Sequence, residues 1–400
     1  MTICITKFGD LRYDSRTLRG MRALRDMDHE VVAVGITDRG RSGTEEWEGM
    51  RFTRVRVSVG GWSKWKFLQY HWKAIGAVLR TKAQVVHAHD VYSLMVAGWA
   101  AVWSGAKLIY EARELFTEVS GLVDRPVERA IWGAVERMWI NRSDQVITVS
   151  DGIAGMLSER YRIPRPVVIR NLPEYREVHR TSLLRERLGI PKERKIALYQ
   201  GVLGTGRGLE GLIRVTEQVE KIDLVLLGDG PLRAELKTRA QNSPARERIH
   251  MLNAVPPDHL LEYTASADIG VHLIQNTCLN HYYCLPNKLF QYVLAGVPVI
   301  ISNLPEIAKV VQAYDIGILV DPAHEGAVAQ AMRRMAEEDE LRKHYARHAQ
   351  QAAPLLNWEQ ERAKLREAYE GIADCGLRIA DCSPHHPKSE IRDPRSRSLG

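Results

Sequence analysis

The sequence predicts an α/β protein with two doubly wound domains, each built on a largely parallel sheet. Short apolar runs alternate with helical patterns along most of the 400 residues. Runs such as VVAVGI, KLIYEA and QVITVS are continuously apolar, which is typical of parallel strands that helices cover on both faces. The alternation occurs in two series separated by a proline-rich stretch at 162–194, so two sheets are expected.

The first series predicts a domain over residues 1–175. Each apolar run of strand length is followed by a stretch whose apolar residues recur at helical spacing. Strands are expected at 2–7, 31–36, 52–57, 84–88, 107–110 and 145–149, and helices at 15–27, 63–80, 91–103, 127–141 and 151–161.

The second series predicts a domain over residues 176–356. Its strands are expected in KIALYQG, DLVLLGDG, RIHML, ADIGVHLI, VPVII and GILVD, again with helices between them. A helical pattern follows at 357–373. The remaining residues, 374–400, are polar and rich in Pro, Ser and Arg, and we expect them to be disordered.

Composition places the chain among soluble globular proteins, with 45% hydrophobic and 26% charged residues. The start, MTICITKFGD, lacks the pattern of a signal peptide, and no apolar run approaches the roughly 20 residues of a membrane span. Five scattered cysteines indicate reduced thiols, so a cytoplasmic location is expected. Cys375, Cys382, His385 and His386 match no zinc spacing, and we expect no metal site there.

The segment YQGVLGTGRGLEGL, at 199–212, has the properties of a phosphate-binding loop. It follows a strong strand and opens a helix, and its glycines allow a close approach of the backbone. Arg207 adds a cation. A flexible turn is the alternative interpretation. Gly206, Gly208 and Gly211 also satisfy G-x-G-x-x-G, but they lie too far after the strand for a nicotinamide or flavin fingerprint.

A second segment, YCLPNKLFQYVLAGVPVI, places Lys288 in the first turn of a predicted helix. The helix dipole disfavours a cation there unless an anion binds both. This helix lies between two predicted strands, so it begins at their carboxyl edge. Arg207 and Lys288 together could therefore hold one diphosphate.

At these residues the chain resembles the retaining glycosyltransferases of family 4, which have the GT-B fold. The matching segments are VVHAHD, YEARELFTE, DQVITVSDGI, VIRNLP, YQGVLGTGRGLEGLI, LVLLGDGPLRAEL, ADIGVHLI and PNKLFQYVLAGVPVI, and the resemblance as a whole spans roughly residues 1–372. The resemblance implies two facing Rossmann-like domains, with the acceptor on the first and the nucleotide-sugar donor on the second. It also implies that the helix of 357–373 crosses back to the first domain, and that no metal or other cofactor is required.

Site residues follow from the resemblance position by position. Arg207 and Lys288 would hold the diphosphate of a UDP- or GDP-linked sugar, and Gln291 would accept hydrogen bonds from the ribose. The other donor-binding positions are Gly9, Gly201, Gly204, Gly208, Asn253, Val255, Tyr283 and Asn287. The usual account of the family requires no protein nucleophile.

The chain departs from the family pattern at three places. Two glutamates separated by seven residues are common in the family, and here Tyr283 and Gln291 hold those positions. A neutral amide is a weaker acceptor than a carboxylate, and tyrosine cannot supply its charge. Arg113 and Glu114 stand where many relatives have a histidine followed by an acid. The catalytic candidates are thus His89, Arg113 and Glu114, although His89 could equally cap a buried strand.

The resulting hypothesis is a retaining glycosyltransferase acting on a lipid-linked or glycan acceptor in envelope or polysaccharide biosynthesis. The alternatives are a catalytically degenerate GT-B subunit, which keeps the diphosphate site but has lost both glutamates, and a sugar-nucleotide epimerase of the same fold.

A basic window also predicts an anionic membrane surface as a partner, and no nucleic acid is expected. Residues 51–82 hold eight Lys or Arg and no Asp or Glu. Within 60–80, helical spacing predicts that Trp65, Leu68, Trp72, Ile75 and Leu79 pack against the sheet. That leaves Trp62, Lys64, Lys66, Phe67 and Lys73 for the outward face, which would dock the protein peripherally on the inner side of a membrane. A basic rim for a soluble anionic acceptor is the competing interpretation.

Overall fold

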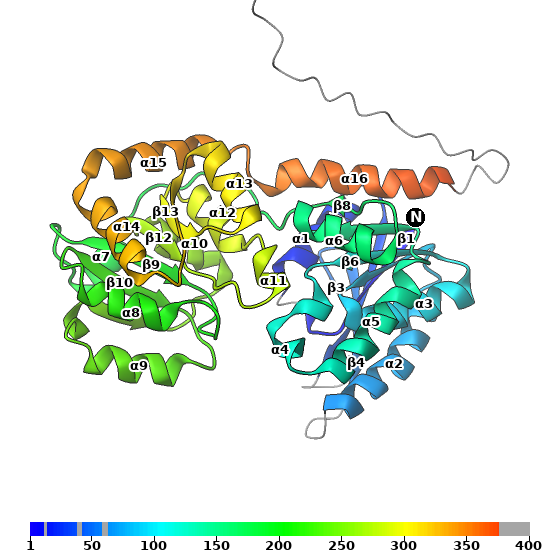
Figure 1. Cartoon of the computed structure of the whole chain (residues 1–400). Coiled ribbons are helices and arrows are strands. Elements are labelled where there is room, and N and C mark those ends of the chain that lie inside the picture. Colours follow the sequence, from blue (N-terminus) through cyan, green and yellow to red (C-terminus); the bar gives the residue numbers. More distant parts are fainter. Residues whose placement is uncertain (12–13, 38–41, 58–62, 376–400) are drawn as a thin grey trace, which may run out of the picture.

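The structure, a computed structural model, has two α/β domains that lie side by side (Figure 1). It describes residues 1–11, 14–37, 42–57 and 63–375. Within this part, the side chains of Ser63, Lys64, Lys66 and residues 373–375 are not described. Trp62 and most of the predicted disordered tail therefore lie outside the described residues.

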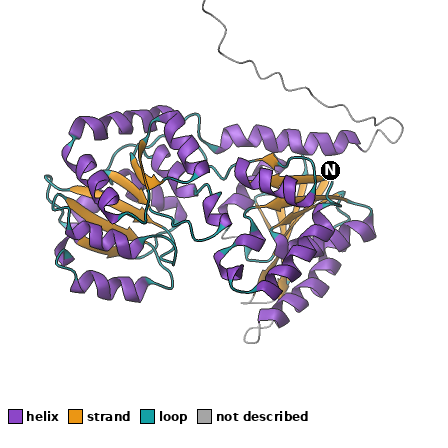
Figure 2. Ribbon diagram, viewed as in Figure 1, coloured by secondary structure: helices purple, strands orange, loops and turns teal. Residues whose placement is uncertain are grey.

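The first domain is built on an eight-stranded sheet in the order β3-β4-β2-β1-β5-β6-β7-β8, with helices on both faces (Figure 2). Its strands are β1 (Thr2–Lys7), β2 (Glu30–Thr37), β3 (Gly43–Trp47), β4 (Met50–Arg56), β5 (Val85–His89), β6 (Lys107–Ala112), β7 (Gln145–Thr148) and β8 (Val167–Val168). Its helices are α1 (Ser15–Arg25), α2 (Ser63–Arg80), α3 (Val91–Ser104), α4 (Ser120–Val123), α5 (Pro126–Ile140) and α6 (Asp151–Tyr161), with the 3-10 helix η2 (Phe116–Glu118) before α4.

One strand of this sheet is antiparallel and was not predicted. β3 pairs with β4 through a two-residue turn at Glu48 and Gly49, whose φ angles are 51° and 69°. Positive φ at both turn residues matches the twist of the strands that such a hairpin joins. The other neighbouring pairs are parallel, as the apolar runs predicted.

The second domain has a parallel sheet in the order β11-β10-β9-β12-β13-β14. Its strands are β9 (Lys195–Gln200), β10 (Ile222–Leu227), β11 (Ile249–Leu252), β12 (Ile269–His272), β13 (Val299–Ser302) and β14 (Gly317–Val320). Its helices are α7 (Leu183–Leu188), α8 (Leu209–Glu217), α9 (Arg233–Asn242), α10 (Pro257–Ala265), α11 (Leu279–Tyr282), α12 (Asn287–Leu294), α13 (Pro305–Tyr314), α14 (Glu325–Glu337) and α15 (Asp339–Ala352), with η3 (Arg246–Arg248) before β11. The predicted pair of doubly wound domains is confirmed.

The last helix, α16 (Trp358–Cys375), lies along the first domain, where it contacts α1 and β8 (Figure 1). Trp358, Leu365 and Tyr369 belong to the same buried apolar cluster as the β1 residue Ile5. The Tyr369 hydroxyl also lies 2.7 Å from Nδ1 of His87 on β5. The expectation that the C-terminal helix crosses back is thus confirmed.

The face of α2 that meets the sheet is not the predicted one. Trp65, Leu68 and Trp72 were expected in the core, but they are 59%, 45% and 74% exposed. Ile75 and Leu79 are partly buried. The buried face instead carries Tyr70, Ala74, Ala77 and Val78.

Phe67 was also misplaced, because it was predicted to face outward. Its ring packs edge-on against Phe8, Tyr92 and Trp132, with centroids 5.1–6.0 Å apart. Both sides of α2 are apolar at helical spacing, so the pattern alone did not distinguish them. The alanines on the true inner side let the helix approach the sheet closely, which the bulky tryptophans would prevent.

Substitution on the two sides of α2 should give opposite results. Tyr70→Ala should reduce the free energy of unfolding by about 3 kcal/mol or more, because it leaves a cavity in the core. Trp72→Ala should change it by no more than about 0.5 kcal/mol, as at an ordinary surface position. Urea unfolding of both variants measures the difference, and equal losses would contradict this assignment of faces.

Candidate functional site

Two cationic side chains that act on each other electrostatically follow the carboxyl ends of strands of the second domain. Arg207 lies between β9 and α8, and Lys288 lies in the first turn of α12. Lys288 extends over Gly201, where an added Cβ would lie 2.4 Å from Lys288 Cε and 2.8 Å from Nζ. Gly201 has a φ of 118°, so both its conformation and its missing side chain make room for the lysine.

The surroundings of these cations lack negative charge. Within the described part of the chain, no carboxylate pairs with Lys288 or Arg207. Burial and the nearby Arg207 lower the pKa of Lys288 to about 8. Burial, Lys288 and Arg207 also hold the pKa of the wholly buried His272 far below its usual range. Like charges held together beside a helix N-terminus indicate a site for an anion.

The glycine loop is held in place by its backbone. Gly206 and Gly208 have φ angles of 72° and 65°, and Gly208 is the N-cap of α8. A Cβ on Gly208 would lie 2.7 Å from the Leu273 carbonyl oxygen, and the Gln275 N–H donates to the Gly206 carbonyl. Gly204 meets no such constraint, since an added Cβ would contact only Val202, at 3.7 Å. The loop therefore carries Arg207 on a backbone fixed against the end of β12.

Gln291 lies one turn further along α12 and belongs to a chain of polar contacts. Its Oε1 accepts from Gln200 Nε2 at 2.8 Å, and Gln200 Oε1 lies 2.8 Å from Thr264 Oγ1. Gln200 and Thr264 are both buried, whereas Gln291 lines a cavity of about 450 Å³ between the domains. A buried neighbour thus fixes the orientation of the Gln291 amide.

The two residues predicted near the nucleobase follow β11 at the same edge of the sheet. Asn253 is exposed, and its Oδ1 accepts from Arg233 Nη2 at 2.5 Å. Val255 is partly buried against the apolar core. Both therefore lie on the predicted side of the second domain.

Tyr283, at the position of the first family glutamate, turns toward the first domain. A Cβ on Gly152 would lie 2.2 Å from its ring, and Ser150 Oγ donates to its carbonyl oxygen at 2.9 Å. Asn280, one turn earlier, accepts from the Leu115 N–H at 2.9 Å. The segment around α11 therefore bridges the domains.

The first domain faces this segment across a cavity of about 360 Å³. Its lining residues come from both domains and are mostly polar: Lys7, Asp10, Asp14, Ser15, Arg16, Arg113, Val149, Asn171, Leu285 and Asn287. Gly9 lies in the loop beside it and accepts from the Ile36 N–H through its carbonyl. Burial lowers the pKa of Lys7 to about 8, and the nearby Arg113 adds to this effect.

Arg113 is the best-anchored residue of that cavity. Its Nη1 pairs with Asp14 at 2.6 Å, its Nε with Glu111 at 2.9 Å, and its Nη2 donates to His89 Nδ1 at 2.7 Å. Because Nδ1 of His89 accepts this bond, that nitrogen carries no proton. Burial is the main cause of a His89 pKa far below the usual value, so the ring is neutral.

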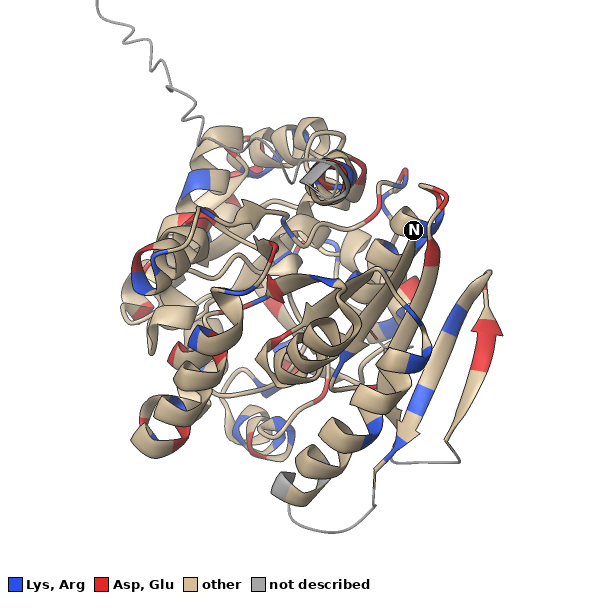
Figure 3. Ribbon diagram, turned by 90° about the vertical axis from the view of Figure 1, so that its right-hand side faces the viewer, with Lys and Arg blue, Asp and Glu red and all other residues tan. Residues whose placement is uncertain are grey.

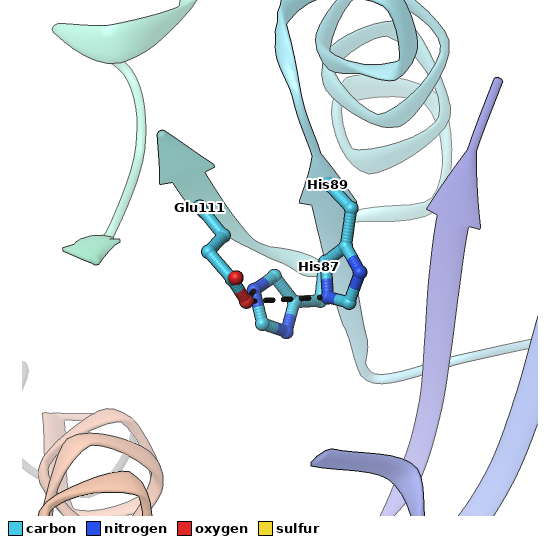
Figure 4. A group of neighbouring side chains, drawn as sticks. All are labelled: His87, His89 and Glu111. Carbon is cyan, nitrogen blue, oxygen red and sulfur yellow. Dashed lines mark ion pairs between the residues drawn. The ribbon is translucent and has the colours of Figure 1, made fainter. Parts of the chain in front are cut away.

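His89 lies behind Arg113, away from the cavity. It is 2% exposed, and Figure 4 shows its ring and that of His87 pointing toward the Glu111 carboxylate. These three residues are close enough to share a metal ion. Arg16 and Arg113 already bind the same Glu111 oxygen at 2.6 and 2.9 Å, however, so the donor set fits an ion pair better than a cation site.

Glu114 lies at the boundary between the domains. Desolvation and the nearby Asp90 carboxylate raise its pKa, while the side-chain amide of Asn280 donates to Glu114 Oε2 at 3.3 Å and opposes that shift. A carboxyl with a raised pKa is suited to proton transfer.

Comparison with known proteins places this arrangement in a family. The family model described as Glycosyl transferases group 1 matches residues 181–352, and the one described as Glycosyltransferase Family 4 matches residues 16–172. The chain is a group 1 glycosyltransferase of the GT-B fold. The enzyme class predicted from the sequence is thereby confirmed.

Curated relatives of this glycosyltransferase are distant. It is 21% identical over 336 residues to an alpha-monoglucosyldiacylglycerol synthase of Streptococcus pneumoniae. This alignment covers 79% of this chain and 74% of the relative. It is 23% identical over 313 residues to a phosphatidyl-myo-inositol mannosyltransferase of Mycobacterium leprae, covering 74% and 75% of the two chains.

Solved structures agree on the fold. A sucrose-phosphate synthase from Thermosynechococcus elongatus superposes with a TM-score of 0.79 at 17% identity, covering 94% of this chain and all of the other. HepE of Anabaena, solved in complex with UDP-glucose, gives a TM-score of 0.74 at 14% identity and covers 93% of this chain and 100% of its own.

Sequence reasoning missed several residues of the site. Lys7, Asp14 and Asn171 line the smaller cavity, and Gln200 holds Gln291. Three of them had a usable signal, because Lys7, Asn171 and Gln200 each stand at or just beyond the end of a strand-like run, where ligands of parallel sheets bind.

The cation pair predicts a loss of diphosphate affinity on substitution. Arg207→Ala and Lys288→Ala should each weaken nucleoside-diphosphate binding by about 1.5–3 kcal/mol, the value of a charge-assisted hydrogen bond. Arg214→Ala is the control, since Arg214 lies on α8 and pairs with Glu325. Calorimetric titration with UDP and GDP measures the effect. Unchanged affinity in both site variants would refute the assignment of Arg207 and Lys288 to the diphosphate site.

The low pKa of Lys288 predicts a pH dependence of the same affinity. Between pH 7 and pH 9 the free protein loses the Lys288 proton, because its pKa is about 8. Binding of a diphosphate should therefore weaken over this range, and Lys288→Arg should show less of this weakening, since arginine stays charged. If diphosphate affinity depends on pH equally in the wild type and in Lys288→Arg, Lys288 does not titrate at the site.

Proposed function

We propose that this glycosyltransferase moves a sugar from a UDP- or GDP-linked donor to a lipid-linked or glycan acceptor, with retention of anomeric configuration and without a metal. The observation that carries the proposal is the like-charge pair Arg207–Lys288, which lacks a protein anion within the described residues. A diphosphate would supply the missing charge. Structural relatives solved with UDP and UDP-glucose support a nucleotide-sugar donor.

In the proposed reaction, the bond between the anomeric carbon and the diphosphate oxygen breaks. The acceptor hydroxyl oxygen bonds to that carbon on the same face, and its proton passes to the departing phosphate oxygen. Arg207 and Lys288 would stabilise the negative charge that develops on the leaving group. Gly201, Gly204 and Gly208 would let the phosphates approach, with Gly9 on the opposite side, Gln291 at the ribose, and Asn253 and Val255 near the base.

The acceptor would occupy the cavity of the first domain, with Asn287 at its edge. Arg113 would orient the acceptor there, and His89 would hold Arg113 in place through the contact between Nη2 and Nδ1. Glu114 would orient the acceptor hydroxyl whose proton passes to the phosphate oxygen. Tyr283 would shape the closed cleft through its contact with Gly152, because its ring cannot replace the charge of the family glutamate.

The nature of the acceptor is proposed from the relatives. Their names describe a synthase of a glucosylated diacylglycerol and a mannosyltransferase acting on phosphatidyl-myo-inositol, both of which are membrane lipids. A role in envelope or polysaccharide biosynthesis follows, with the protein peripheral on the inner face of a membrane and docked through residues 60–80. None of the described helices is long and apolar enough to cross a membrane.

Turnover with a panel of nucleotide sugars tests the function directly. We expect hydrolysis of one donor at a low rate without acceptor, and an α-linked product from an α-linked donor by proton NMR. Inversion at the anomeric carbon would refute retention. The position of Tyr283 favours a catalytically degenerate subunit as the second candidate, and nucleotide binding without any turnover would support it. Interconversion of two nucleotide sugars would instead support an epimerase.

The glutamine at the ribose position gives a further prediction. Gln291→Glu should sharpen discrimination against a 2′-deoxy nucleotide, because a carboxylate accepts more strongly from hydroxyls and can still accept from Gln200. Comparing the dissociation constants of ribo- and deoxyribonucleotides for both proteins measures the effect. Equal discrimination would mean that position 291 does not face the ribose.

A further inference from the structure

Large apolar side chains are exposed on two neighbouring helices of the first domain. They lie on α2 and α3, two helices that pack against each other on one face of the sheet. The six residues that form this tryptophan face are Trp65, Leu68, Trp72, Trp99, Val102 and Trp103, with exposed fractions of 59%, 45%, 74%, 40%, 59% and 57%. A cluster of this size on a soluble domain marks an interaction surface.

The composition of α3 points to a partner outside the chain. Its sequence, VYSLMVAGWAAVWS, holds no charged residue, although the helix is buried by the sheet, α2 and α5 only in part and exposes Trp99, Val102 and Trp103. A helix that covers a sheet normally presents polar residues to water. Here the outer side instead carries Trp99 and Trp103, whose ring centroids lie 5.8 Å apart. Four tryptophans in all belong to the tryptophan face.

The charged side chains on α2 and just after it are positive. Lys73 and Arg80 are exposed on α2, and Lys82 follows directly after it. The sequences of α2 and α3 contain no Asp or Glu, and in Figure 3, which faces this side of the molecule, neither helix carries a red segment. Cations beside exposed indoles suit a surface that is apolar inside and anionic at its edge.

We propose that the tryptophan face inserts into the interfacial layer of an anionic lipid bilayer. Indole rings favour the headgroup level, and a bilayer can mould itself to the ridges of two helices. A second copy of the same face would bring Lys73 and Arg80 close to like charges, which disfavours a symmetric dimer. The inference deepens the proposed function, since it names the surface that would hold the acceptor cavity near a membrane-borne acceptor.

This surface differs from the one that sequence predicted. The sequence predicted Trp62, Lys64, Lys66, Phe67 and Lys73 on the outward face, with Trp65 and Trp72 in the core. In the structure, the tryptophans are outside and α3 adds half of the face. Binding should therefore have an apolar component that persists in salt, in addition to an electrostatic one that salt weakens.

Vesicle sedimentation with the full-length protein tests the proposal. The wild type should bind phosphatidylcholine vesicles that contain phosphatidylglycerol. The double variant Trp72→Ser, Trp103→Ser should lose roughly tenfold or more in affinity, because two indoles no longer enter the interface. Lys73→Glu with Arg80→Glu should weaken binding mainly at low salt. Trp47→Ser is the matched control, since Trp47 is 41% exposed on the edge strand β3, and it should bind as the wild type does.

Brominated lipids add a direct readout of insertion. They should quench part of the tryptophan fluorescence of the wild type, and the double variant should lose most of that quenching. The proposal is overturned if the wild type stays in the supernatant at low salt, if the double variant binds equally well, or if light scattering shows a dimer that the double variant abolishes.

Two measurements separate this proposal from the proposed function. The double variant should keep the thermal midpoint and the donor hydrolysis rate of the wild type, because both side chains are exposed and lie away from the cleft. Vesicle binding without any turnover would contradict the proposed sugar transfer but not the tryptophan face. Turnover without vesicle binding would contradict the tryptophan face and the proposed membrane docking, but not the sugar transfer.

Discussion

The repulsion between Arg207 and Lys288 is the constraint that the second domain must overcome. Two cations near each other at the end of a parallel sheet repel, and here burial, together with this repulsion, lowers the pKa of Lys288 to about 8. The fold keeps them together with backbone geometry: a glycine at 201 that leaves space for the lysine, and a loop fixed against β12. An anion bound beside both cations would reduce this repulsion.

In the first domain, by contrast, the cationic side chains near the cavity are paired with carboxylates. There, Arg16 and Arg113 are neutralised by Glu111 and Asp14, so the cationic groups near the cavity are rigid and already paired. The network extends through His89 and His87 to Tyr369 of α16. A helix that emerges from the second domain thus supports the floor of the cavity in the first. The positions of the side chains around this cavity therefore depend on how α16 packs against the first domain.

The elements that could be predicted were those with a strong local signal. Continuous apolar runs predicted the parallel strands, and the proline before Asn287 predicted the start of the helix that carries Lys288. The sequence did not distinguish the two apolar sides of α2, because burial depends on which side has small residues opposite the sheet. Nor could it show that Tyr283 would turn onto Gly152, or that His89 would lie behind Arg113. Those are contacts between segments far apart in the chain, which no local pattern encodes.

The most direct test of the central claim is the structure of the protein with a bound nucleoside diphosphate. The account predicts phosphate oxygens within about 2.7–3.2 Å of both the Arg207 guanidinium and the Lys288 ammonium, with the ribose beside Gln291. A nucleotide bound elsewhere, or one whose phosphates touch neither cation, would contradict it.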